Sequence, residues 1–135
     1  MNTLFVGDNA VLQTGQDGAS FVVMGANATV VSVGSDVIFA GAGHSTIYDT
    51  GIQAASGTYQ GDTVVLGAGT ATVLIGSINS TVYGGSGNLN IIGNPNGLGI
   101  FWGGGITSMT HDSSGTTVHT GLGATAHLFA AGSVS

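Results

Sequence analysis

Aspartate and histidine are the residue types in this chain that could perform acid–base chemistry or bind a metal ion, because Cys, Glu, Lys and Arg are absent. Paired carboxylates would suit glycoside hydrolysis, and at least three converging ligands would suit zinc. Neither pattern is found: the acids are scattered singly, the histidines share no repeat position, and adjacent residues point to opposite faces of a strand. We therefore expect no catalytic residue, no cofactor and no enzyme activity. The residues concerned are Asp8, Asp17, Asp36, Asp49, Asp62, Asp112, His44, His111, His119 and His127.

The formal net charge of −6 comes entirely from aspartate. Without Lys or Arg the chain cannot neutralise phosphates, so nucleic-acid binding is excluded, as is a polybasic contact with a membrane surface. No apolar run reaches the length of about 18 residues that a transmembrane helix needs, so we expect no membrane insertion. The N-terminal residues carry no basic side chain, so no cleaved signal peptide is expected. Since 42% of the residues are hydrophobic, the chain should fold.

Glycines recur along the chain at intervals equal to the separation of Gly7 and Gly25, or to a multiple of it, and such a series is called a column here. A fixed period of this kind indicates a repeat architecture. Three such columns can be followed along the chain. They are Gly7, Gly25, Gly43, Gly61, Gly97 and Gly115; then Gly15, Gly51, Gly69, Gly87, Gly105 and Gly123; and finally Gly67, Gly85, Gly103 and Gly121.

Two short apolar segments, half a period apart, occupy each 18-residue row, as in Val64–Leu66 and Val73–Ile75. Short β-branched runs bounded by glycine are typical of strands. The pattern predicts an all-β fold, a two-sided parallel β-solenoid (β-roll) of about seven and a half coils, forming a single domain over residues 1–135. The predicted turn glycines are Gly25, Gly43, Gly61, Gly69, Gly87, Gly105 and Gly123.

Alternation along the strands predicts which columns face the core, although the parity of the first strand in each row stays open because both of its columns are apolar. We expect three other residues, Ile38, Leu74 and Ile92, to form a lateral apolar face on the outside. One predicted inward column is Ala19, Val37, Ala55, Val73, Ile91 and Met109, with Phe21, Phe39, Ile75 and Phe129 beside it. The opposite one is Val64, Val82, Ile100 and Val118.

The stretch Gly84-Gly85-Ser86-Gly87-Asn88-Leu89-Asn90-Ile91 resembles the RTX nonapeptide GGxGxDxUx, in which U is a large apolar residue. By its period the whole chain resembles the glycine-rich repeat arrays of secreted alphaproteobacterial proteins. This resemblance implies a parallel β-roll, calcium ions held between coils by aspartates, and type I secretion through an uncleaved C-terminal signal.

Calcium binding is not expected to carry over from that family. In the columns that correspond to its aspartates, no aspartate of this chain has another aspartate one period away, whereas calcium prefers six to eight oxygen ligands. Asp8 and Asp17 remain the weak candidates for a single site.

The solenoid ends suggest a function, because neither carries a Lys, and Pro95 is the single proline that could interrupt pairing. We expect the protein to be its own partner, a homopolymer that stacks end to end into an extracellular or cell-surface filament or biofilm layer. Seven and a half coils would rotate successive subunits by half a turn. The alternative is an adhesin or ligand-binding solenoid, including an ice binder that uses the Thr63, Thr81 and Thr117 column. The predicted self-assembly residues are Leu4, Phe5, Val6, His127, Leu128 and Phe129.

Overall fold

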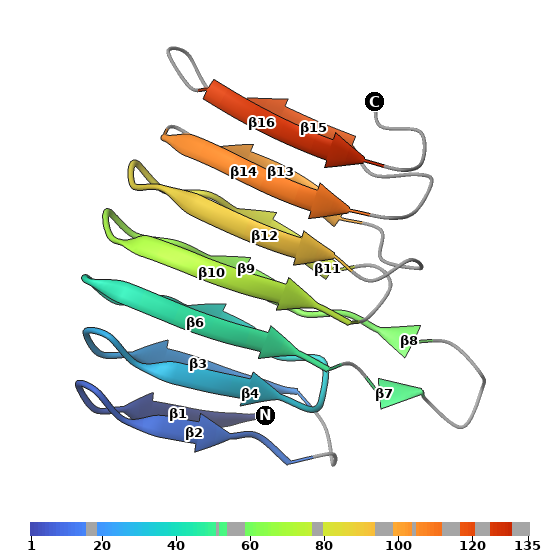
Figure 1. The fold of residues 1–135 in the computed structure, drawn as a ribbon. Helices are drawn as coiled ribbons and strands as arrows, with labels where there is room; N and C mark the ends of the chain where they lie inside the picture. The colour runs from blue at the N-terminus through green and yellow to red at the C-terminus, as the bar shows by residue number, and fades with distance from the viewer. Residues whose placement is uncertain are drawn as a thin grey trace.

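A computed structural model describes residues 1–15, 19–50, 52–53, 59–76, 80–93, 99–103, 105–111, 117–120 and 125–130. These residues form an all-β structure, and its parallel sheets build a β-solenoid, which confirms the prediction of an all-β solenoid (Figure 1). The described part of the chain contains no helix long and apolar enough to span a membrane.

Two seven-stranded sheets face each other, and the chain alternates between them. The first sheet contains β1 (Asn2–Val6), β3 (Ser20–Met24), β5 (Val37–Phe39), β9 (Thr63–Val65), β11 (Ser80–Tyr83), β13 (Gly99–Gly103) and β15 (Thr117–Thr120), in that order. The second sheet contains β2 (Val11–Gln13), β4 (Thr29–Ser32), β6 (His44–Asp49), β10 (Thr70–Ile75), β12 (Leu89–Gly93), β14 (Ile106–His111) and β16 (Thr125–Ala130).

The strand register follows the predicted period over much of the chain. In several of the parallel strand pairs, the two partners are separated by the same number of residues as Gly7 and Gly25; examples are Asn2 with Ser20 and Ala71 with Leu89. Each coil therefore hydrogen-bonds to the next one through short strands, as the glycine spacing predicts.

A short antiparallel hairpin interrupts this period. Its strands are β7 (Ile52–Gln53) and β8 (Tyr59–Gln60), and they belong to neither main sheet. Figure 1 shows them projecting from the side of the solenoid. Across this insertion the step between paired residues is longer than elsewhere, since Val37 pairs with Thr63 and Thr46 pairs with Thr72.

The insertion shifts the phase of the repeat by about half a coil, so one part of the row assignment is wrong. The row from residue 44 to residue 61 is not a complete coil: its segment Thr46–Tyr48 lies in the second sheet, whereas Val64 lies in the first. The predicted weak strand around Ala55 lies outside the described residues.

The core lies between the two sheets and includes several predicted inward residues: Val64, Val73, Ile75, Val82 and Ile91 are all buried. The prediction is wrong in the first half of the first sheet. There Phe21, Val37 and Phe39 are half-buried on the outer side of their strands, and Ala19 is also half-buried. The burial of Ala55, Ile100, Met109, Val118 and Phe129 lies outside what the structure describes.

Ile38 is the clearest of these corrections, because it is fully buried rather than part of an outer face. Its register partners in the first sheet are Val22 and Val64, both of which point into the core. An uninterrupted period places Ile38 in one column with Leu74, but the hairpin puts these two residues in different sheets.

Truncation of Ile38 should therefore act as a core mutation. We expect Ile38→Ala to lower the free energy of unfolding by about 2–4 kcal/mol, because it removes buried methyl groups and leaves a cavity. Ile92, which is 41% exposed on the second sheet, is the matched control, and Ile92→Ala should cost less than about 1 kcal/mol. Urea unfolding measures both, and equal losses would contradict the assigned parity.

Candidate functional site: open ends and a buried carboxyl cluster

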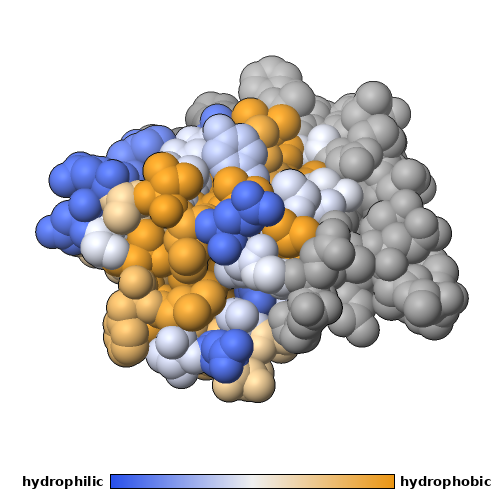
Figure 2. Space-filling view, turned by 90° about the horizontal axis from the view of Figure 1, so that it is seen from below, coloured by the Kyte–Doolittle hydropathy of each residue, from blue (hydrophilic) through white to orange (hydrophobic). Residues whose placement is uncertain are grey.

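The solenoid end formed by β1 and β2 exposes part of the hydrophobic core. Leu4 pairs with Val22, and Leu12 pairs with Val30. Both valines are fully buried, whereas the two leucines pack against the core and remain partly exposed. Among the described residues no strand lies beyond β1 or β2. Figure 2, which views this end, shows apolar side chains gathered over much of its described part, with polar ones at one margin and some among them.

The opposite end is formed by β15 and β16, the last strands of the two sheets. Val118 of β15 shares a register position with Phe101 and Val82, and Leu128 of β16 shares one with Met109 and Ile91. When the pairing is followed from strand to strand, Val118 falls in the register position of Leu4 in the first sheet, and Leu128 falls in that of Leu12 in the second sheet. The two ends therefore match each other in register.

The predicted self-assembly residues lie in two end strands, but in different sheets. Leu4, Phe5 and Val6 belong to β1, whereas His127, Leu128 and Phe129 belong to β16. Phe5 is 78% exposed on the outer side of β1, and Val6 is buried. The sequence-based prediction does not include the other two end strands, β2 and β15. The reason is the insertion: the half of each row that belongs to one sheet before the insertion belongs to the other sheet after it.

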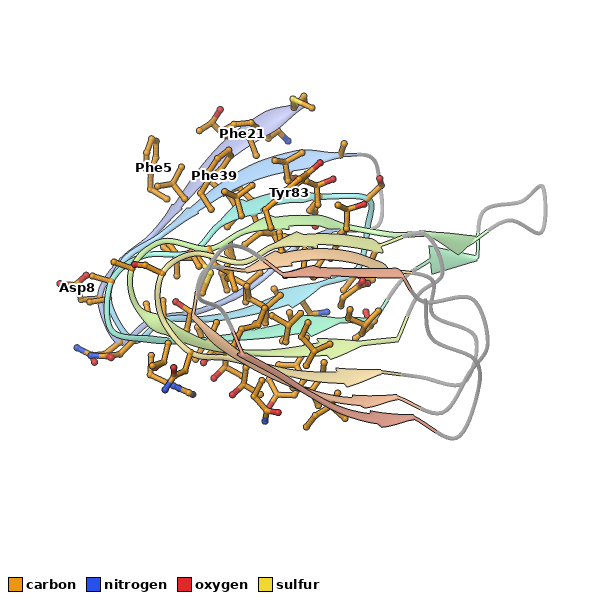
Figure 3. All side chains as sticks on the ribbon, turned by 90° about the horizontal axis from the view of Figure 1, so that it is seen from above. Phe5, Asp8, Phe21, Phe39 and Tyr83 are labelled. Carbon is orange, nitrogen blue, oxygen red and sulfur yellow. The ribbon has the colours of Figure 1, made fainter. Side chains whose placement is uncertain are left out.

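An aromatic stripe runs across the outer face of the first sheet. Phe5, Val23, Phe39, Val65 and Tyr83 occupy one register position on successive strands. Figure 3 shows Phe5, Phe21, Phe39 and Tyr83 projecting from the same side of the solenoid, and the ring centroids of Phe21 and Phe39 are 4.9 Å apart. The alternation in the sequence does not predict this stripe, because it places Phe21 and Phe39 in the core.

The outer face of the second sheet has one apolar and one polar column. Two of the three predicted lateral residues, Leu74 and Ile92, are adjacent in the apolar column and line a shallow groove with Tyr48. The third, Ile38, is buried in the core. The polar column beside them contains Thr29, Thr46, Thr72 and Asn90.

The turns that lead from the first sheet to the second, here called the glycine turns, form one stack. The structure places Gly43, which has a φ of +83°, one coil before Gly69 in this stack. The glycine stack thus combines members of two sequence columns. Gly7, Gly25, Gly43, Gly69, Gly87 and Gly105 lie in these turns, Gly61 lies between β8 and β9, and Gly123 is outside the described residues.

Three aspartates are buried where the chain returns from the second sheet to the first. Asp36, Asp49 and Asp62 are 1%, 2% and 1% exposed, and we call them the carboxyl cluster. Asp49 ends β6, while Asp36 and Asp62 directly precede β5 and β9. Buried carboxyl groups need hydrogen bonds or a neutralising charge, and this chain has no Lys or Arg to supply one.

Asp36 is held by three donors. Its Oδ2 accepts hydrogen bonds from the hydroxyls of Thr14 at 2.6 Å and Ser32 at 2.7 Å, and its Oδ1 accepts one from the Ser20 amide at 2.7 Å. The Asp36 amide in turn donates to Asp62 Oδ1 at 2.8 Å. Asp36 therefore ties four successive coils together from inside the solenoid.

Ser80 connects the other two members of the cluster. Its hydroxyl donates to Asp49 Oδ2 and accepts a hydrogen bond from the Asp62 amide at 3.2 Å. Burial first, and the charge of Asp49 second, raise the pKa of Asp62 to about 8, although the nearby Ser32 hydroxyl and Asp36 amide oppose the shift. Burial and the charge of Asp49 thus favour the protonated form of Asp62.

This cluster corrects the expectation that no aspartate lies one coil away from another. Asp36 and Asp62 occupy the same register position on neighbouring coils, since Val37 pairs with Thr63. The sequence did contain the signal: Ser35-Asp36-Val37-Ile38-Phe39-Ala40-Gly41-Ala42-Gly43 matches Gly61-Asp62-Thr63-Val64-Val65-Leu66-Gly67-Ala68-Gly69 in its Asp and Gly-Ala-Gly positions. A search for the period of the glycine columns overlooks this match, because its step is longer.

The weak candidates for a metal site do not come together in the described residues. Asp8 lies exposed in a glycine turn, where its Oδ1 accepts a hydrogen bond from the Ala26 amide at 2.8 Å, and Asp17 lies outside the described part. No group of three or more His, Cys, Asp or Glu side chains in that part is arranged to hold a metal ion. Comparison with family models, curated proteins and solved structures finds no match for this chain.

Proposed function

We propose that this protein is a structural subunit that stacks end to end into an extracellular filament or surface layer. The observation that carries the proposal is the partly exposed core at the β1–β2 end, where Leu4 and Leu12 lack the neighbours that bury Val22 and Val30. A solenoid that stays monomeric needs a polar covering at such an end. A second copy of the same chain would supply the missing strands.

The end strands offer hydrogen bonds as well as apolar contacts. A strand at the end of a sheet presents unpaired N–H and C=O groups, and proteins commonly protect such strands with lysine, proline or a covering segment. Neither β1 nor β2 contains a charged residue or a proline. Parallel pairing of β1 with β15 and of β2 with β16 would continue both sheets across the joint.

This pairing also sets the orientation of the subunits. The predicted seven and a half coils counted residues 44–61 as a full coil, whereas the β7–β8 hairpin occupies part of that segment. We propose seven coils, one for each pair of strands in the two sheets. Leu4 would then meet Val118 and Leu12 would meet Leu128 without any rotation between subunits, in place of the half-turn expected from length alone.

Two observations favour a location outside the cell: the absence of Lys, Arg and Cys from the sequence, and the resemblance to secreted repeat arrays. A chain without Lys or Arg offers no cleavage site to trypsin-like proteases, and a chain without Cys folds independently of redox conditions. We propose export without a cleaved signal peptide, followed by assembly at the cell surface or in a biofilm matrix. The filament itself would be the functional form, with no substrate and no enzymatic step.

Negative-stain electron microscopy of the wild type and of Leu12→Lys tests the proposal. In the monomer the lysine side chain can reach water through the open end, but in the stack it would be buried without a counter-charge, which costs several kcal/mol. Since about 1.4 kcal/mol corresponds to a tenfold change in an equilibrium constant, the critical concentration for assembly should rise at least about a hundredfold.

The matched control places the same charge away from the ends. Asn90 is exposed in the middle of the second sheet, so Asn90→Lys should leave the critical concentration unchanged. Circular dichroism should show native β-structure in both variants. Wild-type particles of single-subunit size at high concentration, or filaments that persist in Leu12→Lys, would contradict end-to-end stacking.

The second candidate function is a binding solenoid, including an ice binder. Threonines in regular rows favour it, and the row Thr29, Thr46 and Thr72 on the second sheet is one member longer than the Thr63–Thr81 pair on the first. Its coil-to-coil spacing is about 4.8 Å. The row ends at Asn90, which makes the flat surface short. Single-subunit particles in the microscopy experiment would favour this alternative.

A further inference from the structure

The outer face of the second sheet carries a platform of side chains from three neighbouring strands, β6, β10 and β12, which lie next to one another in Figure 1. Alternate residues along a strand point to the same side, so each strand supplies a row of outward side chains. None of these side chains is buried. We call this set the lateral platform: His44, Thr46 and Tyr48 from β6, Thr70, Thr72 and Leu74 from β10, and Asn88, Asn90 and Ile92 from β12 and the residue before it.

The lateral platform has an apolar part and a polar part that lie side by side. Its apolar part is the column of Tyr48, Leu74 and Ile92, which lines the shallow groove described above. The other side chains end in hydroxyl, amide or imidazole groups. Most of them line a second shallow hollow, formed by His44, Thr70, Thr72, Asn88 and Asn90. A surface of this kind suits a ligand that presents both apolar and hydrogen-bonding groups.

Hydrogen bonds hold part of the polar surface in place before any ligand binds. The Nδ1 atom of His44 is hydrogen-bonded to the Thr70 hydroxyl at 2.8 Å, and its Nε2 atom to the Thr72 hydroxyl at 3.4 Å. The His44 amide donates to Asn27 Oδ1 at 2.9 Å. A hydroxyl has one proton and two lone pairs, so both threonines keep bonding capacity for a ligand. Because the ring is already fixed, it loses little conformational freedom on binding.

Asn88 and Asn90 add hydrogen-bonding groups that the described residues do not use. Both side chains are exposed, and within the described part of the chain neither takes part in a hydrogen bond. Each amide offers two N–H donors and a carbonyl acceptor. An amide next to a hydroxyl can both donate to and accept from a sugar hydroxyl, so the polar column is suited to a polyhydroxyl ligand.

Charge excludes several other ligand classes. The chain has a net charge of −6 and no Lys or Arg. Anionic polymers would therefore be repelled, and a phosphate or carboxylate would find no basic side chain to neutralise it. A second copy of this chain would have to bury the amides of Asn88 and Asn90, which is costly without matching partners. A neutral ligand with hydroxyls and apolar C–H surfaces meets neither obstacle.

We propose that the lateral platform binds an extended, neutral β-linked glucan that lies along the solenoid axis. In such a polysaccharide the hydroxyls project from the edges of each ring, and the two faces of the ring present C–H groups. One face would rest on the apolar column of Tyr48, Leu74 and Ile92. The hydroxyls of one edge would bond to Thr72 and Asn90.

The repeat of the solenoid supports this orientation. Successive coils are about 4.8 Å apart, which is close to the length of one sugar unit in an extended glucan. Each sugar would therefore meet an apolar and a polar side chain of the same coil, as at Leu74 with Thr72 and at Ile92 with Asn90. The inference goes beyond the proposed filament and does not depend on it, because the lateral platform lies on the side of the solenoid and stays open in monomer and stack.

Isothermal titration calorimetry with cellohexaose, a linear β-linked glucan fragment, tests the proposal. Tyr48→Ala removes the aromatic surface under the sugar and should weaken binding at least about tenfold. Asn90→Ala removes hydrogen bonds to the sugar hydroxyls and should weaken binding by about threefold to tenfold. Both positions are exposed, so circular dichroism should show native β-structure in each variant.

Tyr83→Ala is the matched control. Tyr83 is 44% exposed and Tyr48 is 40% exposed, but Tyr83 lies on the first sheet. Its truncation should leave the affinity for cellohexaose unchanged. Two further ligands test shape and charge in the wild type. Maltohexaose, whose α-linked chain coils, and oligogalacturonate, which carries carboxylates, should each bind at least about tenfold more weakly than cellohexaose.

Several outcomes would overturn the proposal. One is the absence of cellohexaose binding to the wild type at millimolar concentration. Another is an equal loss of affinity in Tyr48→Ala and Tyr83→Ala, which would reject the second sheet as the specific site. Equal affinity for oligogalacturonate would reject the charge argument. If Tyr48→Ala does not fold, Asn90→Ala alone must weaken binding.

The filament and the glucan site fail separately. Asn90→Lys should lose cellohexaose binding at least about tenfold while its critical concentration for assembly stays that of the wild type. Leu12→Lys, at the open end, should show the opposite behaviour, with normal binding and impaired assembly. Loss of both properties in Asn90→Lys would mean that the lateral platform is a contact between copies, and would reject it as a glucan site.

Discussion

Replacing Gly85 by Ala should destabilise the solenoid by more than about 4 kcal/mol, the largest effect expected of any methyl group added to the glycine turns. A Cβ atom at this position would overlap the carbonyl oxygen of Gly67, one coil below, and would lie 2.8 Å from the carbonyl oxygen of Leu66. Both obstacles are backbone atoms held by strand pairing between β9 and β11, so a side-chain rotation cannot relieve the overlap.

The matched control is Gly7→Ala in the first glycine turn. An added Cβ there meets no atom within 4 Å, so this change should shift stability by less than about 1 kcal/mol, and loss of backbone freedom in the unfolded chain could make it stabilising. Urea or thermal unfolding of the two variants measures the difference. Similar losses in both would mean that the glycines serve turn conformation rather than the close stacking of coils.

The glycine stack also explains what the sequence could and could not predict. The period was readable because stacked turns leave no room for a Cβ, which makes glycine recur. The period alone does not show which half of each row belongs to which sheet. The hairpin lengthens one coil by nearly the length of one strand and one turn. After the hairpin, glycines therefore still fall close to the columns expected from the period, but the glycines in the glycine turns now belong to the other column.

Ile38 and Asp62 show the consequences of this phase error in physical terms. Strand residues alternate between two faces, so a displaced register exchanges inside and outside for a whole segment. The uninterrupted period puts Ile38 outside and leaves Asp62 isolated, whereas Ile38 is in the core and Asp62 stacks on Asp36. The Asp and Gly-Ala-Gly positions that recur from Asp36 to Asp62 would have corrected both errors.

The second large effect is expected from Asp36→Ala, which should lower the free energy of unfolding by about 3–5 kcal/mol at neutral pH. The substitution leaves the Thr14 hydroxyl, the Ser20 amide and the Ser32 hydroxyl without their acceptor inside the solenoid. Each unpaired buried donor costs about 1–3 kcal/mol, with less than full additivity because the two hydroxyls can rotate toward other acceptors. Urea unfolding at pH 7 provides the measurement.

Two companion variants separate hydrogen bonding from the loss of a carboxylate in general. Asp8→Ala removes one exposed acceptor, that of the Ala26 amide, and should cost less than about 1 kcal/mol. Asp36→Asn keeps an acceptor for the Ser20 amide, and the hydroxyls of Thr14 and Ser32 can turn to accept from its amide group, so it should lose less than half as much stability as Asp36→Ala. If Asp36→Asn and Asp36→Ala were equally destabilised, the charge of Asp36, rather than its three hydrogen bonds, would be what joins the coils.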